Sequence, residues 1–330
     1  MNGQRMISQA LSKEDILSIF DNPAVLEPYL EKEAITRSYE KNFEQLVALL
    51  PLEPNQRILD VGTSHGPPSL ALLRREPTLQ IVAMDPAKNV LEISRAKFHG
   101  EHIDELIAKY AHNMAVAAYL ADQYHECIAF KNNITYVQAF AEDVSASVHG
   151  HFDHVLASLA LHWLIDPEKA FSRFHEVLNL RGTVAITSAS WKYKLSDPQL
   201  QHEYRFDNAP FVKQFYDNLD VLLGFQRTVS VAEQPDYWDA DKVLALLAQT
   251  GFELVAYKEN RKPVSFGGMI LSCKTGAFYR STSRLKAIDY DQFSEMFREA
   301  LLKTLREVNP LESVTQYGEM SPYILARKVD

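Results

Sequence analysis

The residues best suited to chemistry surround a sharp turn within ILDVGTSHGPPSLALL, residues 58–73 of the chain. An apolar, β-branched run ends beside Asp60, the glycines Gly62 and Gly66 follow, and two prolines open a leucine-rich run. Glycine permits positive φ and close backbone approach, and the unpaired N–H groups at a helix start attract electron-rich groups. The prolines fit a first helical turn, where their missing N–H groups would have had no partner. The segment therefore predicts a strand, a ligand-binding turn and a helix, with Asp60 accepting from a cationic or N–H-bearing ligand.

A second carboxylate, Asp85, ends the next apolar run, QIVAMD, at residues 80–85. It follows the glycine turn by about 20 residues, the spacing at which a carboxylate can accept from both hydroxyls of a ribose. The turn and Asp85 together predict an adenosine-type ligand, and a turn with a purely structural role is the alternative. A nicotinamide-binding turn usually reads G-x-G-x-x-G, whereas this one reads D-x-G-x-x-x-G.

The elements that must position these residues alternate between strand-like and helix-like segments from residue 57 onward. Short apolar runs occur at RILDVG, QIVAMD, ITYVQAF, FDHVLASL and TVAITSAS, with helical periodicity between them. Such alternation predicts βαβ units, the α/β class and a mostly parallel, doubly wound sheet. Ligands of such sheets bind at the carboxyl ends of the strands, which is where Asp60 and Asp85 fall.

Four segments in combination resemble the class I S-adenosylmethionine-dependent methyltransferases. They are LDVGTSHG, IVAMD, VQAFAEDV and FDHVLASLALHWLIDPEKAFSRFHEVLNLRGTVAITSAS, and the last is similar to a small-molecule group with a His-Trp pair after the fourth strand. The resemblance covers roughly residues 35–190 and extends weakly to the end of the chain. It implies a Rossmann-like, seven-stranded sheet with helical cap and lid insertions. It also implies methyl transfer from S-adenosyl-L-methionine, with no metal, to oxygen, nitrogen or carbon of a small acceptor.

The resemblance further implies which residues hold the cofactor. The first motif would cradle the methionine part, and Asp85 would bind the ribose. Ala141 and Glu142 would contact adenine, and the segment SLALHW would form the wall below the sulfonium. The implied cofactor-binding set is Asp60, Gly62, Thr63, Ser64, Gly66, Asp85, Pro86, Ala141, Glu142, Ser158 and Leu159.

Two positions depart from the family pattern. Ser64 stands where the family has its middle glycine, and the serine would narrow the methionine channel. Phe140 stands where the family has a small or acidic residue, and its ring is expected to stack on adenine or pack behind it.

His162 lies just past the predicted fourth strand and is the candidate catalytic residue. As a general base it would remove a proton from an acceptor hydroxyl, because imidazole titrates near the working pH. The alternative is that His162 orders its loop. The neighbouring Trp163 is expected to pack in the core. A carboxylate acceptor would need no base, whereas a phenol, alcohol or enol would benefit from one.

The chain divides into four predicted parts. Residues 1–50 form an N-terminal helical cap, residues 51–190 the cofactor-binding core, and residues 191–240 a lid. Residues 241–330 complete the core sheet, with a helical insertion near 264–312.

The predicted lid is rich in aromatic residues, which predict an apolar or aromatic acceptor. The alternative is that the rings give a small helical cap its own core. The ten aromatic residues of this stretch are Trp191, Tyr193, Tyr204, Phe206, Phe211, Phe215, Tyr216, Phe225, Tyr237 and Trp238.

Two helices have predicted bounds that the structure can test. Apolar residues from Ile103 to Ile128 recur at helical spacing and predict one long amphipathic helix, packed on the cap or on another subunit. A second helix is predicted from Pro167 to Leu178, with Gly182 after its end.

Composition excludes several classes of partner. A net charge of −9 argues against nucleic acid, because phosphates need a basic face. No apolar stretch long enough to span a membrane occurs, and the opening residues do not resemble a signal peptide. Cys127 and Cys273 lie far apart in sequence and are expected to be reduced thiols of a cytoplasmic protein.

The sequence therefore favours a methyltransferase with a small-molecule acceptor, acting as a monomer or a homo-oligomer. Two alternatives stay open: a nicotinamide-dependent dehydrogenase, and a cofactor-binding protein that transfers no methyl group.

Overall fold

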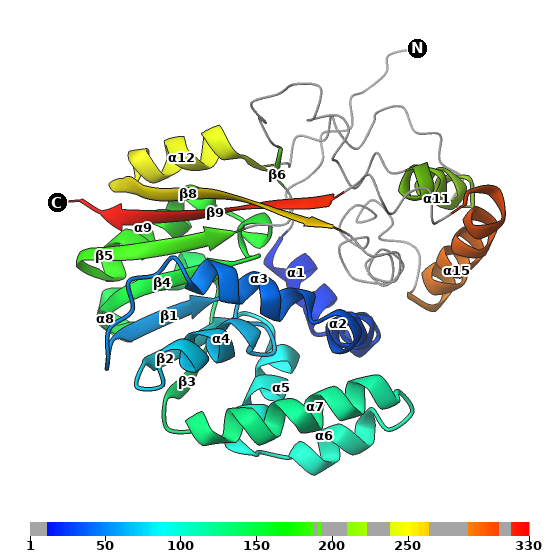
Figure 1. The fold of residues 1–330 in the computed structure, drawn as a ribbon, viewed down its shortest axis with the longest axis horizontal. Helices are drawn as coiled ribbons and strands as arrows, with labels where there is room; N and C mark the ends of the chain where they lie inside the picture. The colour runs from blue at the N-terminus through cyan, green and yellow to red at the C-terminus, as the bar shows by residue number, and fades with distance from the viewer. Residues whose placement is uncertain are drawn as a thin grey trace.

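A computed structural model describes residues 12–187, 191–192, 210–222, 238–263, 290–309 and 318–329. Its centre is a seven-stranded sheet in the order β3-β2-β1-β4-β5-β9-β8 (Figure 1). The strands are β1 (Arg57–Val61), β2 (Gln80–Asp85), β3 (Ile134–Gln138), β4 (Phe152–Ser158), β5 (Leu178–Thr187), β8 (Phe252–Pro263) and β9 (Gly318–Lys328).

The sheet confirms the predicted α/β class and the mostly parallel, doubly wound arrangement. Strands β1 to β5 run parallel to one another, and β9 is antiparallel to both β5 and β8. The chain steps outward from β1 through β2 to β3 and then returns to place β4 on the other side of β1. Sheets of this kind bind ligands at such a reversal, outside the carboxyl ends of the strands.

Helices cover both faces of the sheet. One face packs against α3 (Ser38–Val47), α4 (Pro67–Arg75) and α5 (Lys88–His99), and the other against α9 (Pro167–Val177) and α12 (Ala240–Gln249). Strands covered on both sides are apolar along their length, because successive side chains enter opposite cores. For this reason β1 and β2 read as continuous apolar runs in the sequence.

Two further helices precede α3. They are α1 (Lys13–Phe20) and α2 (Pro23–Thr36), and they lie beyond the arrowheads of the parallel strands (Figure 1). Leu26 and Leu30 of α2 are buried in a cluster with Val90 and Ile93 of α5. The N-terminal helices are therefore packed against the edge of the sheet at which ligands are expected. The division into cap, core, lid and completing segment stays a prediction.

The single helix predicted from Ile103 to Ile128 is wrong. The segment forms two helices, α6 (Ile103–Lys109) and α7 (Met114–Cys127), followed by a short 3-10 turn. Asn113 caps α7, because its side chain accepts a hydrogen bond of 3.3 Å from the backbone N–H of Val116. The two helices lie side by side below α5 (Figure 1).

The second predicted helix is nearly correct but ends one residue early, at Val177. Leu178 already pairs with Phe152 as the first residue of β5, and Gly182 lies inside this strand. A Cβ atom on Gly182 would lie 2.9 Å from two carbonyl oxygens, those of Asn179 and Asp153. The glycine therefore allows the irregular start of β5 and does not end the helix.

The predicted lid and insertion are described only in part. Helix α11 (Pro210–Leu222) belongs to the lid and α15 (Tyr290–Glu307) to the insertion. Phe211 and Phe215 are wholly buried, and the ring of Phe215 lies 4.8 Å from that of Phe297. Phe215 therefore packs against α15, as the alternative of a small helical core requires. The side chains of the other eight lid aromatics lie outside the described part of the chain.

The remaining elements are short. They are η1 (Ile128–Phe130), η2 (Ala141–Asp143), α8 (Ala146–His149), η3 (Leu161–Trp163), β6 (Trp191–Lys192) and β7 (Trp238–Asp239).

Candidate functional site

Asp60 sits at the carboxyl end of β1 and is wholly buried. Its Oδ2 accepts hydrogen bonds from Thr63 Oγ1 at 2.7 Å and Ser69 Oγ at 2.6 Å. Its Oδ1 is buried and has no partner. Burial raises the pKa of Asp60 to about 6, although the two hydroxyls favour the ionised form. One carboxylate oxygen is thus fixed by the turn and the other is available to a ligand.

The turn after β1 needs its two glycines. Gly62 has φ +69°, and a Cβ there would lie 3.0 Å from the Cβ of Ala160. Gly66 has φ +94°, and a Cβ there would lie 2.6 Å from Ser94 Oγ. The N–H groups of Gly62 and Thr63 both donate to the carbonyl of Met84, at 2.8 and 3.0 Å. The turn is therefore held against the end of β2 and against α5.

Ser64 adopts the backbone conformation that the family's glycine would supply. Its φ is +53°, in the left-handed region that costs an L-residue about 1 kcal/mol. The N–H of Ser64 donates to Asp85 Oδ2 at 2.9 Å, and its own Oγ is buried without a partner. The serine is compatible with the turn, and narrowing of the methionine channel stays a prediction.

Asp85 closes β2 beside this turn, as its position in the sequence predicts. Its Oδ1 accepts from the N–H of Ala87 at 3.0 Å, while Oδ2 holds Ser64. Burial, with a smaller contribution from the charge of Asp60, raises the pKa of Asp85 to about 7. Pro86 follows, and its carbonyl accepts from Gln138 Nε2 at 3.1 Å. Two carboxylates that oppose each other's ionisation provide a site suited to a cationic ligand.

The loop after β3 carries the residues expected near adenine. Ala141 and Glu142 are buried, and Glu142 Oε1 accepts from the N–H groups of Ile165 and Asp166, at 2.8 and 3.1 Å. The carboxylate therefore ties this loop to the loop after β4, a role that its sequence position does not reveal. Contact of either residue with adenine stays a prediction.

The end of β4 carries Ser158 and Leu159. Ser158 is buried and its Oγ has no partner. Leu159 has φ +54°, and its N–H donates to the carbonyl of Thr187 at 2.8 Å. Trp163, in the following 3-10 turn, packs edge-on against Phe20 with ring centroids 4.7 Å apart, which supports the expected packing role. The side chain of His162 lies outside the described part of the structure.

Helix α1 and the residue that follows it contact two of these loops and the start of α5. Lys13 Nζ lies 2.6 Å from Asp143 Oδ2 and 4.6 Å from the centre of the Phe140 ring. At the other end of α1, Asp21 accepts from the N–H of Asn89 at 3.0 Å, just beyond Asp85. With the contact of Phe20 on Trp163, α1 touches the loops that follow β3 and β4, and Asp21 just beyond its end touches the start of α5. The helix spans the edge where the candidate site lies.

Unpaired polar atoms mark the same edge. Among the described residues, four buried oxygens without partners lie at the carboxyl ends of β1, β4 and β5 or in the turn after β1. A buried polar group without a hydrogen bond costs about 1–3 kcal/mol, so four together indicate that a ligand supplies the missing bonds. They are Asp60 Oδ1, Ser64 Oγ, Ser158 Oγ and Thr187 Oγ1.

Sequence comparison decides which of the alternative enzyme classes this protein belongs to. Residues 32–257, which include every residue of the site, match the profile of Methyltransf_23, a methyltransferase domain family. The chain belongs to this methyltransferase family. S-Adenosylmethionine is therefore its cofactor and methyl transfer its reaction. No curated protein sequence matches the chain significantly.

Solved structures share the fold at low sequence identity. The [4+2]-cyclase SpnF has a TM-score of 0.55 at 13% identity, and the match covers 97% of both chains. A phosphoethanolamine N-methyltransferase 2 from Haemonchus contortus, in complex with S-adenosylhomocysteine, has a TM-score of 0.51 at 13% identity. That match covers 97% of this chain and 61% of the other. Its complex with S-adenosyl-L-methionine has a TM-score of 0.50 at 14% identity, covering 97% and 60%.

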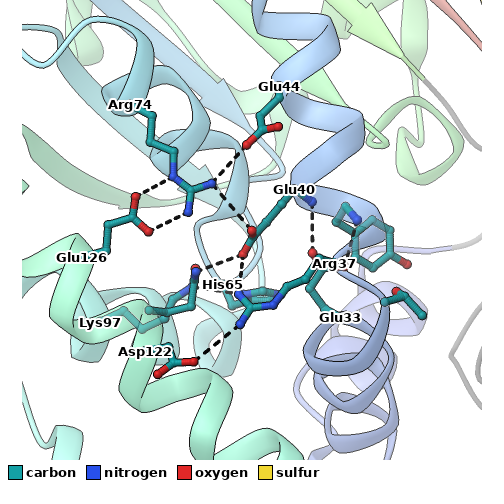
Figure 2. Close-up of polar contacts among 12 residues, drawn as sticks. Glu33, Arg37, Glu40, Glu44, His65, Arg74, Lys97, Asp122 and Glu126 are labelled. Atoms are coloured by element: carbon teal, nitrogen blue, oxygen red, sulfur yellow. Dashed lines mark hydrogen bonds and ion pairs between the residues drawn. The ribbon is translucent and has the colours of Figure 1, made fainter.

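Sequence reasoning missed a polar layer beside the methyltransferase site (Figure 2). Arg74 of α4 binds Glu126 of α7 through two hydrogen bonds of 2.6 Å. Its guanidinium also lies 3.3 and 3.6 Å from Glu44 and Glu40 of α3. The layer fixes α3 and α7 to the helix that follows the glycine turn. No sequence signal could have found it, because its members lie up to 86 positions apart and meet only in the fold.

His65, in the glycine turn, was also missed. It is wholly buried, and its Nδ1 lies 3.2 Å from the Nζ of the equally buried Lys97. Burial lowers the pKa of His65, and the charge of Lys97 lowers it further. The lowered pKa favours the neutral imidazole, which packs the turn against Lys97 of α5 and Tyr119 of α7.

No helix in the described ranges is long and apolar enough to cross a membrane. Nor do those ranges bring together three or more His, Cys, Asp or Glu side chains that could hold a metal ion.

Proposed function

We propose that this methyltransferase acts on oxygen, nitrogen or carbon of a small, largely apolar or aromatic acceptor. The observation that supports S-adenosylmethionine binding at this site most directly is the orphaned Oδ1 of Asp60, buried beside a second carboxylate at the sheet reversal. Such an arrangement suits a small cation that carries hydroxyl and amino donors, as S-adenosylmethionine does. Asp60 would accept from the cationic methionine part and Asp85 from the ribose hydroxyls.

The chain's own residues align and shield the reaction. When bound, the cofactor supplies a methyl group on an activated sulfonium. The protein then has to hold the acceptor atom in line with that methyl group and exclude water. The helix α1 and the loops it joins are placed to close the site from solvent. His162 is proposed as the group that accepts the proton of an acceptor hydroxyl, with ordering of its loop as the alternative.

The acceptor class rests on the aromatic content of residues 191–240. Phe215 belongs to the contact between α11 and α15, and Phe211 is wholly buried. The proposal of an apolar or aromatic acceptor therefore depends on the other aromatic residues of this segment.

Partners and compartment are also proposals. The negative net charge supports a small-molecule acceptor over nucleic acid, and neither a membrane nor a particular oligomer is required. Cys127 is buried and unpaired, and burial raises the pKa of its thiol to about 11. A thiol of this kind is stable in the reducing cytoplasm, which is the proposed location.

Labelled cofactor tests the function. The full chain is incubated with methyl-labelled S-adenosylmethionine and pooled small aromatic and apolar compounds, and products are analysed by mass spectrometry. We expect one class of compound to gain the label. Tight cofactor binding without any labelled product would favour a protein that binds the cofactor but transfers nothing. Binding of a nicotinamide cofactor in its place would favour the dehydrogenase.

Replacing His162 by Ala tests the proposed base. General-base catalysis typically contributes 10²–10⁴-fold, so kcat for a hydroxyl acceptor should fall by about 100-fold while the Kd of S-adenosylmethionine stays within twofold. Steady-state kinetics and calorimetry measure the two quantities. Equal losses of both would assign His162 to ordering the loop.

A further inference from the structure

Two hydroxyls at the ends of neighbouring strands stand out from the rest of the core. Ser158 closes β4 and Thr187 closes β5, and they are register partners in the parallel pair. Register partners in adjacent strands point to the same face, with backbones about 5 Å apart. Ser158 and Thr187 are 3% and 0% exposed, and neither oxygen has a hydrogen-bond partner. The fold therefore brings together two buried hydroxyls and leaves both unpaired.

Most other buried hydroxyls of serine and threonine in the described ranges are paired. The exceptions elsewhere are Ser64 Oγ, in the turn after β1, and, among tyrosines, the hydroxyls of Tyr110 and Tyr119. Thr183, on the same strand and face as Thr187, bonds His154 Nδ1 at 2.7 Å. The remaining buried serines and threonines also have partners. These are Thr63, Ser69, Ser94 and Thr304. Ser158 and Thr187 are the pair of unpaired hydroxyls that face each other across neighbouring strands, at the edge where ligands bind, and this placement points to a bound molecule.

The position of the two hydroxyls separates them from the ribose carboxylate. The strand order runs β2-β1-β4-β5, so Thr187 lies three strand spacings, or about 14 Å, from the strand that carries Asp85. Both hydroxyls lie on the opposite side of the sheet reversal from Asp85, the proposed ribose-binding residue. On the outer side, the register partner of Thr187 is Tyr323 of β9, whose hydroxyl already donates to Asn42 Oδ1 at 2.7 Å. Tyr323, the neighbour of Thr187 on β9, therefore already has a hydrogen-bond partner of its own.

We propose that Ser158 and Thr187 together hold a neutral, oxygen-bearing group of the methyl acceptor. This inference rests on the proposed function and names the polar feature of its substrate: an apolar body with one hydroxyl or carbonyl group. Ser158, which the family resemblance places among the cofactor residues, then contacts the acceptor.

The chemistry of the pair selects the group. A hydroxyl both donates and accepts, so two of them can satisfy a phenol, an alcohol or a ketone. A phosphate or a carboxylate would need a cationic partner, and neither hydroxyl has a charged or neutral partner among the described residues. The hydrogen bond from Leu159 to the Thr187 carbonyl locks the two strand ends together, so the hydroxyls are held in place before the ligand arrives.

The test compares phenol with toluene, which have nearly the same shape and differ in the hydroxyl. Ligand-observed NMR measures both affinities for the full chain saturated with S-adenosylhomocysteine. The wild type should bind phenol at least fivefold more tightly than toluene. Thr187→Val and Ser158→Ala should bring this ratio close to one. The Kd of S-adenosylhomocysteine should change less than twofold in Thr187→Val.

Stability provides a second readout. Removal of an unpaired hydroxyl sacrifices no hydrogen bond, so Thr187→Val should have a Tm equal to or above that of the wild type. The control Thr183→Val loses the hydrogen bond to His154 and should give the opposite result. Its Tm should be lower than that of the wild type, and its preference for phenol over toluene should be unchanged.

Three results would overturn the inference: no phenol preference in the wild type, a preference that survives in Thr187→Val, or a lower Tm for that variant. None of these measurements requires methyl transfer. Failure of the proposed function appears separately, as the absence of any labelled product.

Discussion

Replacing Asp60 by Asn will weaken binding of S-adenosylmethionine by about 100-fold at pH 8. The substitution keeps the shape of the side chain and an acceptor for Thr63 and Ser69, and it removes the negative charge. A hydrogen bond to a charged group contributes about 1.5–3 kcal/mol, and a loss of about 2.7 kcal/mol corresponds to 100-fold in Kd. Isothermal titration calorimetry measures the change.

The same variant will lose much of the pH dependence of binding. In the wild type the pKa values of Asp60 and Asp85 are raised to about 6 and about 7. A cation binds the ionised carboxylates, so binding releases their protons, and affinity falls as pH drops below about 7. The wild type should release up to two protons near pH 6, and Asp60→Asn at most one. Calorimetry in buffers of different ionisation enthalpy counts them.

Stability should move in the opposite direction to binding. A buried carboxyl with a raised pKa stabilises the fold at low pH, and this stabilisation is lost as pH rises from about 4 through 6. For Asp60 the shift from 3.8 to about 6 corresponds to about 3 kcal/mol. Asp60→Asn should therefore raise the free energy of unfolding at pH 8 by about 1–3 kcal/mol, while it lowers the affinity for S-adenosylmethionine.

A matched control exists at the opposite edge of the sheet. Asp153 of β4 accepts from the N–H of Arg57 and from Asn179, far from the glycine turn. Asp153→Asn should leave cofactor affinity and its pH dependence unchanged. If Asp60→Asn proves less stable than the wild type and binds S-adenosylmethionine normally, Asp60 is a structural residue and the proposed site is wrong.

The combination of weaker binding and higher stability follows from the site itself. Asp60 and Asp85 are held where their ionisation is unfavourable, and each makes the other's ionisation harder. A core selected for stability alone would replace them by neutral side chains. The cationic cofactor restores the balance, because its charge favours the ionised carboxylates that burial opposes.

The fold could be predicted from sequence because its signals are local. Strands β1 and β2 read as apolar runs since both faces of the sheet are covered. Asp60 is the penultimate residue of β1 and Asp85 the last residue of β2, so both carboxylates lie at the ligand edge. The glycine turn is defined by residues within a few positions of one another. Asp60, Gly62, Gly66 and Asp85 therefore lie together in the structure, as their spacing predicts.

The errors and omissions have a common origin in contacts that sequence spacing does not show. The helix over 103–128 was predicted whole because Tyr110 and Met114 keep the helical spacing across the break, and the Asn113 cap is a weaker signal than that periodicity. Thr187 reads only as a polar residue at a strand end. That its hydroxyl is unpaired depends on its neighbours on β4 and β9, which lie far away in the chain.

Replacing Gly66 by Ala will lower the free energy of unfolding by about 2–4 kcal/mol. The residue has φ +94°, and left-handed backbone costs an L-residue about 1–2 kcal/mol. The new Cβ would also lie 2.6 Å from Ser94 Oγ and 2.9 Å from Phe98 Cε2. Overpacking of this kind costs about 1–3 kcal/mol. Denaturant titration measures the loss.

The steric clash in Gly66→Ala should also weaken binding of the cofactor. Phe98 is wholly buried and cannot move aside, so α4 and the turn that precedes it must shift. A displaced turn no longer presents Asp60 correctly, and the Kd of S-adenosylmethionine should rise more than tenfold.

Gly100→Ala separates steric crowding from backbone strain. Gly100 has φ +77° and ends α5, but its Cβ would meet nothing closer than 3.4 Å. This control should lose only about 1 kcal/mol and bind the cofactor normally. If both variants lose the same stability and keep the same affinity, contact between the turn and α5 does not position the site. If Ser94→Ala partly restores Gly66→Ala, the crowding at Ser94 is the cause, and the close packing of α4 on α5 is what places the carboxylate of Asp60 at the ligand edge.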